Sequence, residues 1–249
     1  MSLCGVQEPG SAYLTRVSAN RPPKHCLPFR KTSTFTLASG MLNSQHLEPE
    51  PGEQPTSMQS IAKIEIRLQQ AVRDSPAIQA FLDRSHSDGR SAQESRRLLK
   101  VSPEALPNHL TASTLAGNSR ISVPPQIFFD NANGTLIAAY HLGMELSGHV
   151  GLIHGGFLAI VLDECMGRAC FALLPEKIGV TVHMELDYRK PVKADSMVLV
   201  RAVTERVDGR KAWVKGTVMS LGDVAEEVLV EANALFVQPK WAASMEQIM

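Results

Sequence analysis

One segment joins a glycine-rich turn, an apolar helix and two acidic residues, and it constrains the fold of this chain most. His154-Gly155-Gly156 opens an apolar run that contains Asp163 and Glu164. The apolar residues would surround a helix almost completely, which is typical of a buried helix. Backbone N–H groups at a helix start lack intrahelical partners and lie at the positive end of the helix dipole, and glycines leave them open to a ligand. Because acidic residues are seldom buried without a partner or a task, the segment predicts a reactive site on a buried helix.

The two carboxylates of this helix leave alternatives open. Adjacent helix residues point about 100° apart, so only one of Asp163 and Glu164 can face a given pocket. Arg168 follows Glu164 by four residues, and an ion pair between these two side chains would make Glu164 structural.

The pattern around this helix predicts an antiparallel sheet. Alternating or short apolar runs occupy residues 126–129, 135–142, 180–189, 197–207, 211–221 and 228–237. In residues 180–189, Thr181 falls on the polar face together with His183 and Glu185. Asp208-Gly209 is a hairpin signal, and the short connections exclude parallel crossovers, so we expect a meander. One long helix on such a sheet makes an α+β fold.

The amino-terminal part has a different composition. Residues 1–57 are predicted to be a disordered or targeting arm with a linker, because the first 47 residues carry five basic residues against a single acid and are rich in Ser and Thr. Such a composition suits a mitochondrial transit segment, but its prolines interrupt an amphipathic helix, so a disordered basic tail is the alternative. Residues 58–120 are expected to form helices over 58–73, from Ser75-Pro76 onward and over 91–99. These helices would pack on a body at 121–240, or alternatively cover its ligand pocket.

Charge and cysteine content exclude several classes of protein. The formal net charge is zero and no stripe of aromatic and basic residues occurs, which argues against a nucleic-acid binder. No apolar run approaches the length of a membrane span. The four cysteines show neither metal-ligand spacing nor a disulfide framework, so no metal or cofactor is expected. Cys165 and Cys170 are predicted to be reduced core residues in a reducing compartment.

Several motifs between residues 124 and 237 occur together. They are His154-Gly155-Gly156, Asp163 nine residues after that histidine, the strand at 179–188 and Pro191. In this combination the segment resembles hotdog-fold acyl-CoA thioesterases of the phenylacetate-pathway and thioesterase-superfamily-member type, in which an antiparallel sheet wraps a central helix. Matches to single-domain fungal members add Pro124-Pro125, Leu142-Gly143, Gly148-His149, Leu174-Pro175 and residues 209–213.

The resemblance implies an activity and a set of roles. It implies hydrolysis of an acyl-CoA or acyl-carrier thioester in lipid metabolism, by a homodimer or homotetramer that builds its sites between subunits. The Gly155 N–H would polarise the thioester carbonyl, and Asp163 would be the general base or nucleophile, with Thr181 positioning water. His154 would orient the turn or the carbonyl, and Gly156 would contact the substrate.

Two positions leave the site incompletely defined. Related hotdog subfamilies place a catalytic Glu in this helix, which makes Glu164 the alternative to Asp163. Members of the better-known branch carry Asn six residues before the histidine of the turn, where this chain has Gly148 followed by His149. Either His149 replaces that side chain, or its contribution is missing.

Basic residues at strand ends and turns are candidates for the CoA phosphates. They are Arg189, Lys190, Arg210 and Lys211. Three functions are open at this point: a thioesterase, a hotdog hydratase or dehydratase, and a non-catalytic acyl-CoA binder. The spacing of nine residues between His154 and Asp163 favours the thioesterase over the hydratase or dehydratase, and nothing in the sequence excludes the binder. A mitochondrial location is expected, with the cytoplasm as the alternative.

Overall fold

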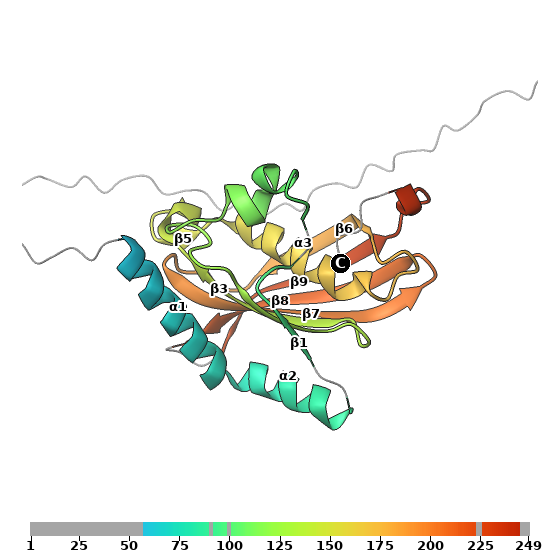
Figure 1. The fold of residues 1–249 in the computed structure, drawn as a ribbon, viewed down its shortest axis with the longest axis horizontal. Coiled ribbons are helices and arrows are strands. Elements are labelled where there is room, and N and C mark those ends of the chain that lie inside the picture. Colours follow the sequence, from blue (N-terminus) through green and yellow to red (C-terminus); the bar gives the residue numbers. More distant parts are fainter. Residues whose placement is uncertain (1–56, 90–91, 99–100, 223–225, 245–249) are drawn as a thin grey trace, which may run out of the picture. The chain divides into compact units, whose positions relative to one another are not determined.

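A seven-stranded antiparallel sheet wraps one face around a long helix, α3 (Gly155–Phe171) (Figure 1). The computed structural model describes residues 57–89, 92–98, 101–222 and 226–244. The strands are β1 (Gln93–Ser95), β2 (Gln126–Asp130), β3 (Thr135–Leu142), β6 (Val180–Tyr188), β7 (Ser196–Asp208), β8 (Lys211–Leu221) and β9 (Val228–Val237). A short ribbon of β4 (Ser147–His149) and β5 (Leu152–Ile153) precedes α3. The predicted α+β hotdog architecture is confirmed.

The strand order shows where the predicted meander was wrong. Neighbours in the sheet run β1-β2-β3-β7-β8-β9-β6, all antiparallel. The meander holds for β7, β8 and β9, but β6 lies at the far edge beside β9. In the chain, α3 and β6 both come between β3 and β7. In the sheet, β7 nevertheless pairs directly with β3, and β6 forms the opposite edge.

The expected helix over 91–99 was also wrong in the part of it that the structure describes. Gln93–Ser95 forms β1, which pairs with β2. The two ends of that predicted helix, residues 91 and 99, lie outside the described residues. So do the predicted arm and linker up to residue 56.

The inner core forms between α3 and the concave face of the sheet. Leu162, Cys165 and Met166 of the helix are fully buried there. A Cβ on Gly216 of β8 would lie 2.6 Å from Met166 Sδ, so glycine lets the helix sit directly on the strand. The carboxyl-terminal half of α3 is buried all round as predicted, whereas Ala159 and Ile160 in the first half are only half-buried.

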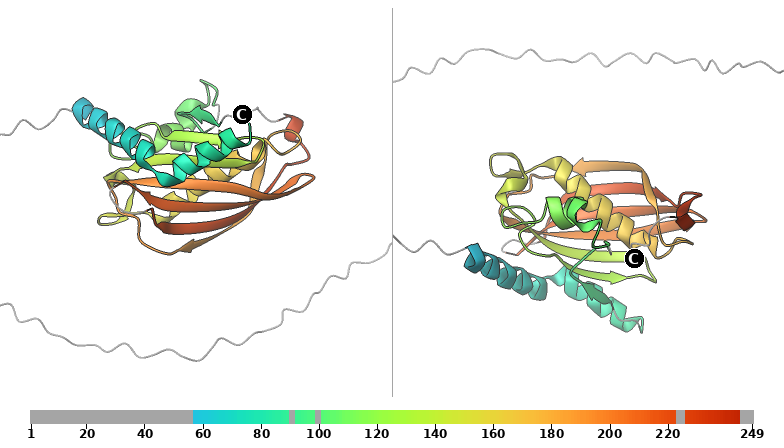
Figure 2. Two further views of the ribbon diagram at one scale, coloured as in Figure 1. Left: turned by 90° about the horizontal axis from the view of Figure 1, so that it is seen from below. Right: turned by 45° about the horizontal axis from the view of Figure 1, so that its top comes forward.

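Two helices cover the other face of the sheet. They are α1 (Ser57–Asp74) and α2 (Pro76–Ser87), the latter capped by Ser75, and both were predicted (Figure 2). Their apolar residues pack with Phe128 and Ile137, whose neighbours Ile127 and Leu136 belong to the inner core. Side chains alternate across a strand, so α1 and α2 lie on the face opposite α3. They pack against the sheet and do not cover α3.

No helix in the described ranges has the length and apolar character that a membrane crossing requires.

Candidate active site

The turn before α3 leaves one backbone donor open. His154 is the N-cap residue, and its Nδ1 accepts a hydrogen bond from the Gly156 N–H at 2.9 Å. The Phe157 N–H donates to the His154 carbonyl at 3.0 Å. Gly155, the first helical residue, has an N–H for which the described part of the chain offers no acceptor. This N–H is therefore the donor available to a ligand, at the positive end of the helix dipole.

The capping contact also defines the state of His154. A ring nitrogen that accepts an N–H bond carries no hydrogen, so the neutral ring holds its hydrogen on Nε2. His154 is exposed. Its side chain caps the turn, and whether it also contacts a substrate carbonyl stays a prediction.

Close contacts explain the glycines at 148 and 155. A Cβ on Gly155 would lie 3.3 Å from the ring of Tyr188, whose hydroxyl donates to the Gly155 carbonyl at 2.9 Å. A Cβ on Gly148 would lie 2.8 Å from His154 Cδ2. The chain thus lacks a side chain at 148 because the His154 ring fills that space. His149 is exposed in β4 and has no recorded side-chain contact with the turn or the carboxylates within the described residues.

Asp163 and Thr181 meet between α3 and β6. The Thr181 hydroxyl donates to Asp163 Oδ1 at 2.6 Å. Placing Thr181 on the polar face with His183 and Glu185 was wrong, because β6 has a bulge: Thr181 pairs with Phe236 and His183 with Leu235, which leaves Val182 extra. The bulge reverses the alternation and turns Thr181 toward the helix.

Glu164 faces a different neighbour. The Thr111 hydroxyl lies 2.9 and 2.8 Å from the two Glu164 oxygens. The alternative pairing of Glu164 with Arg168 is not formed: Arg168 Nη1 donates to Asn131 Oδ1 at 2.9 Å, and its guanidinium lies 4.0 Å from the centre of the Phe129 ring.

The two carboxylates have different surroundings. Burial raises the pKa of Glu164 most, the Thr111 hydrogen bond opposes this, and the charge of Asp163 adds to the increase. Asp163 lies half-buried at the open side of α3 and accepts the hydrogen bond from Thr181.

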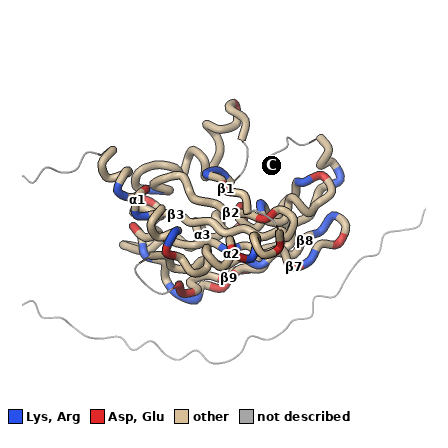
Figure 3. Tube along the Cα trace, turned by 60° about the horizontal axis from the view of Figure 1, so that its bottom comes forward, with Lys and Arg blue, Asp and Glu red and all other residues tan. Residues whose placement is uncertain are grey.

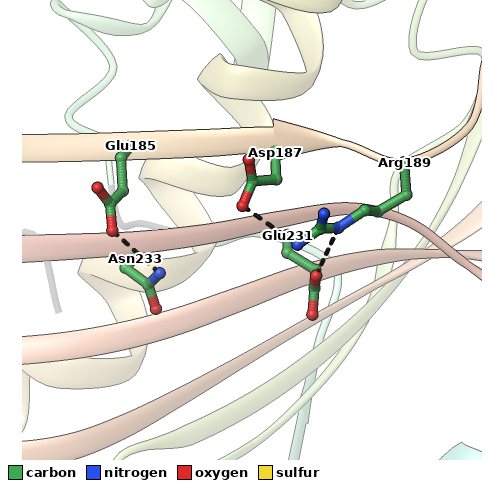
Figure 4. Close-up of polar contacts among 5 residues, drawn as sticks. All are labelled: Glu185, Asp187, Arg189, Glu231 and Asn233. Atoms are coloured by element: carbon green, nitrogen blue, oxygen red, sulfur yellow. Dashed lines mark hydrogen bonds and ion pairs between the residues drawn. The ribbon is translucent and has the colours of Figure 1, made fainter.

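The basic residues predicted for CoA do not gather in one place. Arg189 Nε donates to Glu231 at 2.8 Å and its Nη2 to Asp187 at 3.2 Å (Figure 4). Lys190 is paired with Glu227. These residues follow β6 near the start of β9, where the N–H groups of both bond the Leu229 carbonyl.

The second basic pair lies elsewhere. Arg210 and Lys211 adjoin the other end of β9, where Arg210 Nη1 donates to the Gln238 carbonyl at 2.6 Å and Lys211 pairs with Val237. Figure 3 shows basic and acidic residues interspersed along the trace. Within one chain, the four basic residues form two separate pairs.

A cavity of about 310 Å³ lies on another side of α3. Val161 and Glu164 of the helix and Tyr140 of β3 form one wall, and residues between 96 and 125 form the rest. That segment contains two short turns, η1 (Leu106–Asn108) and η2 (Leu110–Thr114). Neither this cavity nor Thr111 was anticipated from the sequence.

The cysteines of α3 belong to the core. Cys165 and Cys170 are buried and free, as predicted, and burial raises the pKa of each thiol to about 12. Among the described residues no group of three or more His, Cys, Asp or Glu side chains comes together as a metal site.

Known proteins resemble the segment that carries this site. Residues 150–227, from the turn before α3 through β8, match the family described as the thioesterase superfamily. A mitochondrial protein of uncharacterized function from Candida albicans is 33% identical over 137 residues, 54% of this chain and 61% of that protein. The acyl-coenzyme A thioesterase THEM4 of Rattus norvegicus is 30% identical over 112 residues, 45% of this chain and 46% of that enzyme. The chain thus spans about half the length of these relatives.

Solved structures include a similar chain, smu.793 from Streptococcus mutans bound to acetyl CoA. It aligns with a TM-score of 0.40 and 17% identity, over 44% of this chain and 82% of that one.

Proposed function

We propose, because residues 150–227 match the thioesterase superfamily, that this chain hydrolyses acyl thioesters of CoA or of an acyl carrier to a free acid and a thiol. The observation that carries the proposal is the Asp163–Thr181 pair at 2.6 Å on the helix that also offers the open Gly155 N–H. Thioester hydrolysis needs a base for water and a donor for the developing oxyanion, and these groups are of those two kinds.

The spacing of the two groups supports a reaction that takes place between two subunits. Gly155 and Asp163 are eight residues apart, about 12 Å along the helix axis. A carbonyl held by the Gly155 N–H would then lie beyond the reach of Asp163 of the same chain, even through one water. Along the open side of α3, residues that are not buried follow one another at helical spacing. They are Gly156, Ala159, Ile160 and Asp163. Pairing of this stripe with a second copy would bring Gly155 of one subunit to Asp163 of the partner subunit.

The edge strand beside this stripe supports a homodimer or a tetramer built from dimers. β6 is the last strand of the sheet, and Val182 and Tyr188 on it are 59% and 53% exposed. Exposed apolar side chains on an unpaired edge strand are a ready surface for another chain.

The chemistry needs two proton movements. Asp163 accepts a proton from water as the water oxygen bonds to the carbonyl carbon, and Thr181 holds the carboxylate in place. The carbonyl oxygen becomes an oxyanion, which the Gly155 N–H stabilises. Collapse breaks the C–S bond, and the proton on Asp163 passes to the leaving thiolate. The free acid and the thiol are released.

A thiol-release assay over acyl-CoAs of graded length tests the activity. Asp163→Asn should lower turnover by about 10² to 10⁴, the usual contribution of a general base. Glu164→Gln is the matched control on the same helix and should cost far less. If Glu164→Gln lowers turnover more than Asp163→Asn does, Glu164 is the base. If no substrate releases thiol, the protein is an acyl-CoA binder and not a thioesterase.

Mixed dimers test the arrangement between subunits. Gly155→Pro and Asp163→Asn subunits, purified together through two different tags, would form one intact and one doubly damaged site. Because selection through both tags keeps only mixed dimers, about half of wild-type activity is expected in a two-fold dimer. Activity no greater than that of the separate variants would show that both groups act within one chain.

The remaining contacts and the location belong to the same proposal. Arg210 and Lys211 are the better candidates for CoA phosphates, since Arg189 and Lys190 already pair with carboxylates. A mitochondrial location is supported by the name of the Candida albicans relative and by the basic amino-terminal composition, and a role in lipid metabolism would follow from the proposed hydrolysis alone. Fractionation of cells that express the tagged full chain tests the location.

A further inference from the structure

The cavity behind α3 is separate from the thioester site. Val161 and Glu164 contribute its helix wall, whereas Asp163 points to Thr181 of β6. At about 100° per residue, the direction midway between Val161 and Glu164 lies roughly 130° around the helix from Asp163. The two sites therefore open on different sides of the same helix.

The walls of the cavity suit an aliphatic chain. Leu98, Leu106, Ile121 and Val161 are among the lining residues, and the volume of about 310 Å³ has room for roughly ten water-sized groups. Concave, largely apolar spaces with a few convergent polar groups are typical ligand sites. The polar lining residues include Glu164, whose carboxylate accepts a hydrogen bond from the Thr111 hydroxyl and is therefore already partnered.

The lining of the cavity also includes two cationic side chains, Arg96 and Arg97. Arg96 is engaged by Glu65 and by the Pro124 carbonyl. Arg97, which also lines the cavity, is exposed, and its guanidinium makes no ion pair with any described residue. An apolar lining together with an exposed guanidinium that no described residue pairs with matches a molecule that has an aliphatic chain and an anionic head.

We propose that the cavity between α3 and residues 96–98 and 101–125 binds a free aliphatic monocarboxylate of about ten carbons, with its chain inside and its carboxylate at Arg97. This site does not depend on the proposed hydrolysis, and it serves the same chemical class as the acid which that reaction would release.

Calorimetric titration of the full chain with octanoate, decanoate, dodecanoate and decanol tests the proposal. Each methylene that enters the cavity should tighten binding about fourfold, and the gain should stop near ten carbons, when the cavity is full. Val161→Phe should weaken decanoate at least tenfold and move the plateau to shorter chains. Ala112→Phe fills the cavity from the opposite wall and should also weaken decanoate binding. It serves as the second variant if Val161→Phe, which lies in α3, does not fold. Val207→Phe, outside the cavity, is the matched control and should bind as the wild type does.

Two further arms test the head group and the separation of the sites. Arg97→Gln should weaken decanoate about two- to fivefold, as expected for an exposed ion pair, and leave decanol unchanged. Asp163→Asn should bind decanoate as tightly as the wild type. An affinity that does not change with chain length would overturn the proposal. Equal affinities of Val161→Phe and Val207→Phe for decanoate would also overturn it. Displacement of decanoate by decanoyl-CoA in the Asp163→Asn protein would also overturn it, because the cavity would then be part of the thioester site.

Discussion

Replacing Gly155 by proline removes the proposed oxyanion donor and leaves α3 able to form. Gly155 is the first helical residue, where proline is favoured because the N–H there has no intrahelical acceptor. Proline also disfavours the α conformation in the residue before it, and His154 already has φ −62° and ψ 128°. We therefore expect Gly155→Pro to fold, with the His154 cap on Gly156 retained.

Gly155→Ala is the matched control for this variant. Alanine and proline both add a Cβ, which would lie 3.3 Å from the Tyr188 ring. That side chain is 53% exposed, so it can move by the few tenths of an ångström that are needed. Alanine keeps the N–H, and the ratio of the two variants therefore isolates the donor. Loss of one oxyanion donor costs about 10² to 10³ in turnover, which is the factor expected between alanine and proline.

The assay is the turnover number at saturating acyl-CoA, with helix content from circular dichroism and subunit number from light scattering. Both variants should match the wild type in the two structural measurements. Equal turnover numbers in folded Gly155→Pro and Gly155→Ala would refute the reasoning. Gly155 would then serve only to make room for Tyr188.

Three other changes have calculable directions. Thr181→Val should lower turnover about tenfold and Thr181→Ser should restore it, because the lost bond is charge-assisted yet open to solvent; equal kcat for Val and Ser would contradict this. Burial raises the folded-state pKa of Glu164, so its contribution to stability is present below its ordinary pKa and is lost as the pH rises through the folded value. Glu164→Gln should accordingly raise the Tm at about pH 7 and have little effect near pH 4, and a uniform shift at both would count against it. Gly216→Ala should destabilise by about 1–3 kcal/mol in chemical denaturation, because its Cβ would overlap Met166; an unchanged midpoint would show that the helix can move.

Much of the sheet and the start of α3 could be predicted from the sequence. β3, β8 and β9 have the predicted bounds, because alternation and turn residues act locally. The position of β6 beside β9 could not be predicted, since pairing across the sheet depends on how the chain closes around α3. β1 has three polar residues, Gln93, Glu94 and Ser95, and only its partner strand makes it extended.

The contacts of the candidate site were predicted unevenly. The roles of Gly155 and Asp163 came from a resemblance, and the structure adds the open N–H and the Thr181 bond that support them. Thr111 could not be found in advance, because it reaches Glu164 from 53 residues away in a short turn without a sequence pattern. Tyr188 was visible only as an apolar strand residue, and its bond to the Gly155 carbonyl gives it a place beside the turn.

The bulge at Val182 has a consequence for how the length of β6 can vary. Thr181 and Tyr188 are seven positions apart, an odd number, and a regular strand would send them to opposite faces. With one residue set aside, both reach α3, one at Asp163 and the other at Gly155. Deleting Val182 would leave the two residues six positions apart, and a regular strand would then still direct both of them to α3. Related chains that keep both contacts are therefore expected either to carry this bulge or to have a regular strand that is one residue shorter.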